Sequence, residues 1–211
     1  MPEQMTKIYK TNPNSGKAGS LFPHSAFMKR LFDLFICFIA GLILLPFFIV
    51  ITFAVRITSR GPALYWSDRV GLCNTIFKMP KFRTMQVSTP AVATHLLADP
   101  DQYLTPIGSF LRKTSLDELP QLWSIMKGDM SFVGPRPALP REVSIYNSIY
   151  ERRLIAKPGI TGPWQISGRS DLDLRTSVAL DLNYLINWSF TRDLWIIVST
   201  VGAVFKGKGA Y

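Results

Sequence analysis

The sequence predicts an α-rich α+β fold, in which an N-terminal, kinked and re-entrant membrane helix precedes a compact cytosolic domain with interfacial amphipathic helices and a small β element. Three observations predict this class: a long uncharged apolar run, several later segments with helical periodicity, and two strand-like segments around a glycine turn. Composition divides the chain into a flexible basic tail at residues 1–25, an interfacial and membrane-embedded helix at 26–60, and one domain at 61–211.

The membrane helix is predicted from residues 34–55, which are 22 residues without a charge, sixteen of them Leu, Ile, Phe or Val. At about 0.3 to 0.6 kcal/mol for each of these residues, insertion into a bilayer is favoured by about 5 to 10 kcal/mol. A secretory signal peptide would start nearer the N-terminus and end in an Ala-x-Ala-like site. A buried helix of a soluble core rarely stays apolar on every face for this length. Membrane insertion is therefore favoured over both alternatives.

The bend in this helix is predicted from Pro46, which removes a backbone hydrogen bond near the middle of the run. Basic residues stand at both ends, namely Lys29, Arg30, Arg56 and Arg60. A simple span would place one basic end on the wrong side of the membrane, whereas a re-entrant segment keeps both ends in the cytosol. We therefore favour the re-entrant arrangement over a kinked span.

The other elements follow from periodicity and from Gly and Pro breaks. Strands are expected at 63–66 and 74–78 around a turn at 69–71, and helices at 107–113, 116–127, 139–156 and 173–187. Short interfacial helices are expected at 27–31, leading into the membrane, and at 194–205, which is too short to span.

The charge of the chain indicates an anionic partner. The formal net charge is +10 and the isoelectric point is about 9.8. Nucleic acid, acidic lipid headgroups and a phosphorylated substrate would each fit this charge. The basic residues flank membrane segments instead of forming a reading helix, so no nucleic-acid partner is expected. Two cysteines and two widely separated histidines argue against a disulfide framework and a zinc site.

The neighbouring carboxylates Asp117 and Glu118 are the most informative pair in the chain. Ser115 with Glu118 three residues later is typical of a capping box, so a purely structural role is one interpretation. Pro120 favours a helix that starts at Asp117, because a proline is tolerated in the first turn, and this start frees one carboxylate. A helix N-terminus favours the ionised form, which would make Asp117 a nucleophile or metal ligand.

Basic residues recur around this pair and are expected to bind phosphate. Lys81 and Arg83 lie upstream, Arg112 precedes Asp117 by five positions, and Arg136 stands between two prolines that limit its backbone freedom. A solvated basic face or lipid contact is the alternative interpretation. No phosphate-binding P-loop, dinucleotide fingerprint or serine-hydrolase elbow occurs in the sequence.

Four motifs in order resemble one family of bacterial sugar transferases, the monotopic polyprenyl-phosphate phosphoglycosyl transferases in their small form. The motifs are Lys81-Phe82-Arg83-Thr84-Met85, Ser115-Leu116-Asp117-Glu118-Leu119-Pro120-Gln121, Lys127-Gly128-Asp129-Met130-Ser131-Phe132-Val133-Gly134-Pro135-Arg136-Pro137 and Lys157-Pro158-Gly159-Ile160-Thr161-Gly162. The likeness extends from about residue 27 to 205. One departure is Leu45 before Pro46, where the family often carries Ser.

This resemblance implies an enzyme at the bacterial inner membrane with its catalytic domain on the cytoplasmic face. It implies transfer of a sugar 1-phosphate from a UDP-sugar to a polyprenyl (undecaprenyl) phosphate, with Mg²⁺ and release of UMP, as the first membrane step of exopolysaccharide or lipopolysaccharide assembly. By the same likeness Asp117 forms a covalent phosphosugar intermediate and Glu118 holds the metal. The residues that bind substrate would be Lys81, Arg83, Arg112, Arg136, Arg169 and Asp181.

A non-catalytic membrane adaptor is the alternative from another class of protein. Its basic face would bind anionic inner-membrane lipids or recruit enzymes of glycan assembly, and it requires no chemistry at Asp117. Release of UMP from a panel of UDP-sugars separates the two hypotheses. The sugar, the glycan pathway and the oligomeric state, a homo-oligomer included, are left open by the sequence.

Overall fold

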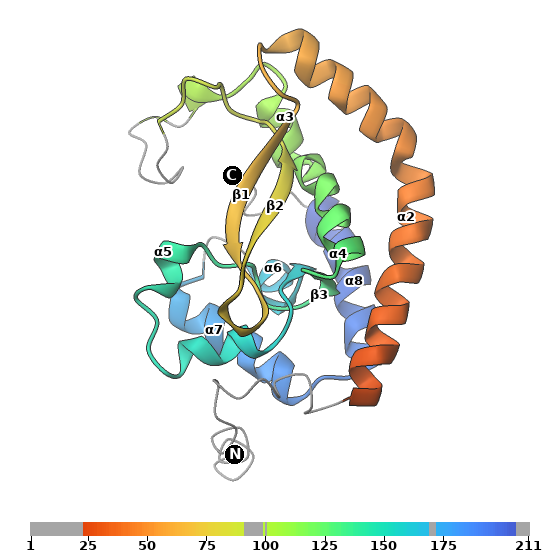
Figure 1. Cartoon of the computed structure of the whole chain (residues 1–211), viewed down its shortest axis with the longest axis vertical. Helices are drawn as coiled ribbons and strands as arrows, with labels where there is room; N and C mark the ends of the chain where they lie inside the picture. The colour runs from red at the N-terminus through yellow and green to blue at the C-terminus, as the bar shows by residue number, and fades with distance from the viewer. Residues whose placement is uncertain (1–22, 91–98, 100, 169–171, 206–211) are drawn as a thin grey trace.

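The computed structural model describes residues 23–90, 99, 101–168 and 172–205 of the 211-residue chain. Its longest element is α2, Pro23–Thr58, a curved helix that runs along one side of the other elements (Figure 1). The part Phe27–Thr58 contains an 18-residue window with a mean hydropathy of 3.1, of which 11% is buried. A core helix of a soluble protein would be mostly buried, so the exposed apolar surface is that expected of a membrane-associated helix.

The α2 helix continues through Pro46 as one element. The residues expected to form a separate interfacial helix at 27–31 are part of α2 as well, so that boundary was wrong. A continuous helix forgoes one backbone hydrogen bond at the proline. The re-entrant bend is not confirmed by this geometry and stays a prediction.

The predicted hairpin is present, with longer strands than expected. Strand β1, Leu64–Val70, pairs antiparallel with β2, Ile76–Phe82, so that Tyr65 faces Lys81 and Arg69 faces Phe77. The turn lies after Val70 and contains the 3₁₀ segment η2, Leu72–Asn74. The turn expected at 69–71 was therefore placed too early, because Arg69 and Val70 belong to β1.

The acidic pair lies in a short 3₁₀ helix. After η4, Asp101–Tyr103, and α3, Gly108–Lys113, the chain forms η5, Leu116–Gln121, and then α4, Leu122–Lys127. The helix predicted at 116–127 is thus two elements. Ser115 adopts the left-handed region at φ 56° and its side chain makes no cap hydrogen bond, so the capping-box interpretation was wrong.

A second small sheet was missed by the sequence analysis. Strand β3, Ser131–Val133, lies parallel to β4, Gly159–Thr161. The backbones come so close that a Cβ added to Gly159 would lie 2.1 Å from the Gly134 nitrogen. These strands are three residues long and come from distant parts of the chain, so neither carries a strand pattern of its own.

The prediction of one long amphipathic helix at 139–156 is wrong. The structure has α5, Pro140–Val143, and the 3₁₀ segment η6, Tyr150–Ile155, separated by a turn. The Asn147 Oδ1 atom accepts hydrogen bonds from the backbone N–H groups of Ile149 and Tyr150. These bonds take the place of the backbone hydrogen bonds that a helix would form here.

The last helices pack against the start of α2. The short α6, Pro163–Ser167, is followed by α7, Leu174–Ile186, and α8, Phe190–Phe205. The Asp193 carboxylate accepts hydrogen bonds from Lys29 on α2 and from Tyr184 and Trp188. Further along α2, the core joins Cys37 to Phe77, Met79, Leu122 and Ile125. This packing fixes the hairpin and α4 beside α2.

Candidate active site

The two neighbouring carboxylates lie beside the end of β2. Lys81 donates a hydrogen bond from Nζ to Glu118 Oε1 at 2.6 Å, and the two side chains form an ion pair. Asp117 is buried, with 9% of its surface exposed, while Glu118 is partly exposed. The hairpin and η5 therefore bring Lys81 to the acidic pair, although Lys81 and Glu118 are 37 positions apart in sequence.

Burial is the main influence on the pKa of the Asp117 carboxyl. Loss of solvent, with a smaller contribution from the negative charge of Glu118, raises the pKa of Asp117 to about 6, although Lys81 and Arg112 oppose the shift. The sequence analysis had expected a helix N-terminus to favour the ionised form, and burial outweighs that effect. A carboxyl with a pKa of about 6 is still mainly ionised at pH 7. Asp117 is thus a poorly solvated carboxylate, which suits a nucleophile.

Arg112 lies next to Asp117 and is held by the segment after β2. Its Nε donates to Thr84 Oγ1 at 3.0 Å. Burial lowers the pKa of Arg112, and the nearby Asp117 carboxylate works in the opposite direction. The structure therefore brings Lys81 and Arg112, both predicted, to the carboxylate pair.

Arg83 points to a different place. Its guanidinium donates to the carbonyl oxygens of Ser59 and Arg60, directly after α2, and to the Ser59 hydroxyl at 2.9 Å. The side chain is 6% exposed. This contact attaches the hairpin to the end of α2, and a role of Arg83 in binding substrate stays a prediction.

Arg136 contacts an acidic and an aromatic side chain. Its Nη1 lies 3.1 Å from Glu142 Oε2, and its guanidinium lies over the Trp164 ring at 5.3 Å. Glu142 also accepts from the Leu139 N–H at 2.8 Å, and both interactions lower its pKa against the effect of burial. Arg136 is about one-third exposed, which leaves its guanidinium open to a ligand.

Asp181 is fully buried and pairs with Arg153, a residue that the sequence analysis missed. Arg153 also donates to the Arg136 carbonyl at 3.2 Å and to the Tyr146 hydroxyl at 3.1 Å. Burial raises the pKa of Asp181 to about 6, although Arg153 opposes the shift. The pair therefore supports the backbone that carries Arg136. Arg169, also predicted to bind substrate, lies outside the described residues.

Arg69 is a second basic residue that the sequence analysis missed as a site residue. It lies in β1, where its Nε donates to Ser67 Oγ at 3.2 Å and its Nη1 to the Pro137 carbonyl at 3.1 Å. Burial and the charge of Arg136 lower the pKa of Arg69 to about 10, against the effects of Glu142 and Glu118. Its place in the predicted turn at 69–71 gave no signal that would have identified it.

The carboxylate pair fits a magnesium ion that is bound together with a phosphate ligand. Within the described parts of the chain, no three Asp, Glu, His or Cys side chains gather as a metal cage. Mg²⁺ commonly uses one or two carboxylates with substrate phosphates and water. Asp117 and Glu118 supply two oxygen ligand groups, and the repulsion between them is one that a cation would relieve.

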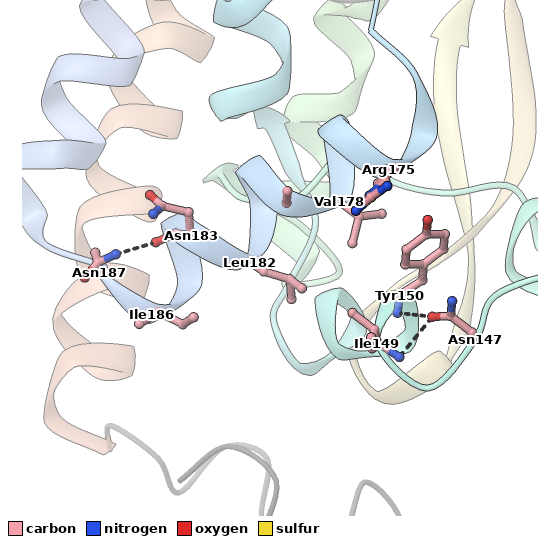
Figure 2. A pocket seen from close by; sticks show the side chains of 10 residues that line it. Asn147, Ile149, Tyr150, Arg175, Val178, Leu182, Asn183, Ile186 and Asn187 are labelled. Atoms are coloured by element: carbon pink, nitrogen blue, oxygen red, sulfur yellow. Dashed lines mark hydrogen bonds between the residues drawn. The ribbon is translucent and has the colours of Figure 1, made fainter. Parts of the chain in front are cut away.

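An open groove lies elsewhere on the surface. Figure 2 shows it between one side of α7 and the turn at Ile149 and Tyr150, with Val178, Leu182 and Ile186 along it. Neither the carboxylate pair nor the basic residues near the pair line this groove. The groove is therefore separate from the candidate site.

A poorly solvated carboxylate beside a second one, with basic side chains near both and an exposed apolar helix in the same fold, is an arrangement expected of an enzyme that handles an anionic substrate. The model of the bacterial sugar transferase family matches residues 24–207 of this chain. The exopolysaccharide production protein ExoY of Sinorhizobium fredii is 40% identical to it, over 92% of this chain and 93% of that protein.

Two longer relatives carry more specific names. The undecaprenyl-phosphate galactose phosphotransferase of Salmonella typhimurium is 41% identical, over 89% of this chain and 42% of that protein. The UDP-glucose:undecaprenyl-phosphate glucose-1-phosphate transferase of Klebsiella pneumoniae is 38% identical, over 87% of this chain and 41% of that protein. The chain thus spans nearly all of ExoY and less than half of these two proteins. The chain belongs to the bacterial sugar transferase family, which confirms the resemblance seen in the motifs.

Proposed function

We propose that this protein transfers a sugar 1-phosphate from a UDP-sugar to undecaprenyl phosphate and releases UMP. The observation that carries the proposal is the buried Asp117 beside Glu118, with Lys81 at 2.6 Å from Glu118 and Arg112 nearby. The names of the Salmonella and Klebsiella relatives support the two substrates.

In the first step a carboxylate oxygen of Asp117 attacks the phosphorus that carries the sugar. The bond between this phosphorus and the bridging oxygen breaks, and UMP leaves with that oxygen. The product is an acyl phosphate between Asp117 and the sugar phosphate. The low solvation of Asp117 helps, because little water must be removed from the nucleophile before the attack.

In the second step an oxygen of undecaprenyl phosphate attacks the same phosphorus. The bond to the Asp117 oxygen breaks, which regenerates the carboxylate and yields a lipid diphosphate sugar. Two steps at one carboxylate mean that the two anionic substrates need not occupy the site together, and this limits their repulsion.

The cations of the site stabilise the negative charge of both substrates. In this proposal Arg112 and Arg136 donate hydrogen bonds to phosphate oxygens, and Lys81 orients Glu118, to which its Nζ donates at 2.6 Å. Glu118 would hold Mg²⁺, which when bound supplies Lewis-acid stabilisation of the diphosphate. Asp181 acts through Arg153 and the Arg136 backbone in this proposal.

The membrane arrangement is part of the proposal. The two ends of α2 would both lie at the cytoplasmic face of the inner membrane, with Arg30 at one end and Arg56 at the other. Helix α8 would lie at the interface, since Trp195 and Val198 are exposed while Ile196 is buried. In this arrangement the lipid phosphate would lie at the level of the carboxylates.

Purified protein with Mg²⁺, undecaprenyl phosphate and a panel of UDP-sugars tests this function. We expect UMP release with at least one sugar, and a rate about 10³-fold lower for Asp117→Asn. Asp68→Asn, at an exposed ion pair on β1, is the matched control and should retain activity. Folded protein that releases no UMP across the panel would support the adaptor hypothesis instead.

A further inference from the structure

Two basic residues, Lys81 and Arg69, lie on the same face of the hairpin, near the carboxylate pair. Residues that face each other in an antiparallel pair, and every second residue along each strand, share a face of the sheet. The pairs Tyr65 with Lys81 and Arg69 with Phe77 are therefore on one face. Lys81 contacts Glu118 from this face, and Arg69 lies further along the same face.

The Arg69 guanidinium is held beside Arg136. Its Nη1 donates to the carbonyl of Pro137, the residue after Arg136, and its Nε donates to Ser67. Among the described residues its Nη2 has no hydrogen-bond partner. Two of the three donor nitrogens thus fix the orientation of the group, and one remains for a ligand.

The charges around Arg69 are those expected of a residue that binds an anion. Arg136 is close enough to lower the pKa of Arg69, while Glu118 and Glu142 act in the opposite direction. Glu142 is engaged by Arg136 and by the Leu139 N–H, and Glu118 by Lys81. Arg69 and Arg136 are half-buried, and the repulsion between their guanidinium groups is reduced when an anion lies between them. A planar guanidinium group can donate two parallel hydrogen bonds to two oxygens of a phosphate.

We propose that Arg69 is a phosphate-binding residue of the active site and forms, with Arg136, an anion site next to Glu118. The ligand class is a phosphate oxygen of either substrate, namely the diphosphate of the nucleotide sugar or the phosphate of the lipid. This inference rests on the proposed function and adds a residue to it. Two half-reactions separate the two sources of the phosphate.

The test compares Arg69→Gln and Arg69→Lys with Lys78→Gln. Lys78 is a suitable control because it is opposite Asp68 on the other face of the hairpin, in an exposed ion pair. We expect Arg69→Gln to lower kcat/KM by about 10- to 100-fold, Arg69→Lys to lose less because it keeps the charge, and Lys78→Gln to match the wild type.

Single-turnover release of UMP without lipid reports the nucleotide-sugar step, and the KM for undecaprenyl phosphate reports the lipid step. A defect in the first measurement assigns Arg69 to the diphosphate, and a defect in the second alone assigns it to the lipid phosphate. Wild-type values in both for Arg69→Gln would overturn the inference.

A binding measurement separates this inference from the proposed function and from a merely structural role. Calorimetric titration with UDP and Mg²⁺ needs no turnover, so it remains informative even if no sugar is transferred. We expect the Kd for UDP to rise by about 10-fold or more in Arg69→Gln, and less in Arg69→Lys. If Arg69 only holds the Pro137 loop, thermal stability will fall in both variants while the folded protein binds UDP and undecaprenyl phosphate normally, and the inference fails.

Discussion

The Nζ atom of Lys81 lies 2.6 Å from Glu118 Oε1, so a strand and a 3₁₀ helix meet at the neighbour of the buried Asp117. Lys81 is the largest of the influences that keep the pKa of Asp117 from rising further. The pair is partly exposed, with 23% and 36% of the two side chains accessible, so its contribution to folding stability is expected to be small. Its contribution to the chemistry should be larger.

Replacing Lys81 by Met should therefore lower kcat by about 10- to 100-fold while the free energy of unfolding changes by less than about 1 kcal/mol. On the acidic side of the pH profile, the pH at which activity reaches half of its maximum should move upward. The reason is that loss of the Lys81 charge raises the pKa of Asp117. Initial rates of UMP release between pH 5 and 9 measure both effects. Lys78→Met is the control, and an equal loss in this variant would contradict a specific role for Lys81.

Replacing Arg153 by Met should leave Asp181 buried without its partner. The free energy of unfolding at pH 7.5 is expected to fall by about 3 to 5 kcal/mol, which chemical denaturation in detergent can measure. Asp68→Asn removes one partner of an exposed pair and should cost less than about 1 kcal/mol.

The loss in Arg153→Met should shrink at low pH. The pKa of Asp181 is raised in the folded protein above its value in the unfolded chain. Protonation of Asp181 therefore stabilises the folded protein at low pH, and this stabilisation is lost as the pH rises through about 6. Without Arg153 the pKa rises further and the dependence becomes steeper. A loss that is constant from pH 5 to 7.5 would argue against the buried pair.

The close contact of β3 and β4 predicts that Gly159→Ala destabilises the fold. The added Cβ would meet the Gly134 nitrogen at 2.1 Å and the Thr161 carbonyl oxygen at 2.3 Å, so the strands must separate. We expect a loss of at least about 2 kcal/mol in the free energy of unfolding. Gly202→Ala, in α8 with no atom within 4 Å, should be neutral or stabilising. Equal stability of the two variants would contradict this packing.

The re-entrant arrangement predicts that both ends of α2 lie on the cytoplasmic side. In a Cys73→Ser background, Met28→Cys and Thr58→Cys should both resist a membrane-impermeant maleimide in intact cells and react after permeabilisation. Cys37 is buried and should stay unreactive in each case. Labelling of one end in intact cells would identify a spanning helix.

Local patterns predicted the elements whose causes are local. The helix at 173–187 was recognised from its periodicity, and the structure adds that Asp173 caps α7 by accepting from the Thr176 N–H. The apolar run of α2 and the hairpin were found for the same reason. The helix at 139–156 failed because the Asn147 side chain competes for the backbone N–H groups within an amphipathic pattern.

The candidate site depends on contacts between distant parts of the chain. Motifs identified Asp117, Glu118, Lys81 and Arg112, but the burial that raises the pKa of Asp117 comes from packing against β2. Arg83 belongs to the same motif as Lys81, yet it binds backbone 23 residues earlier. The pairing of Arg153 with Asp181 likewise joins η6 to α7 and leaves no mark in either local sequence.

The central claim is that Asp117 carries the sugar phosphate, and mass spectrometry of the intact protein and of its peptides tests it most directly. Wild-type protein is mixed with Mg²⁺ and a UDP-sugar that supports UMP release, without lipid. We predict a mass increase of one sugar phosphate on the peptide that contains Asp117, about one UMP per protein molecule, and loss of the adduct when undecaprenyl phosphate is added. No adduct, together with UMP release only when the lipid is present, would contradict the account.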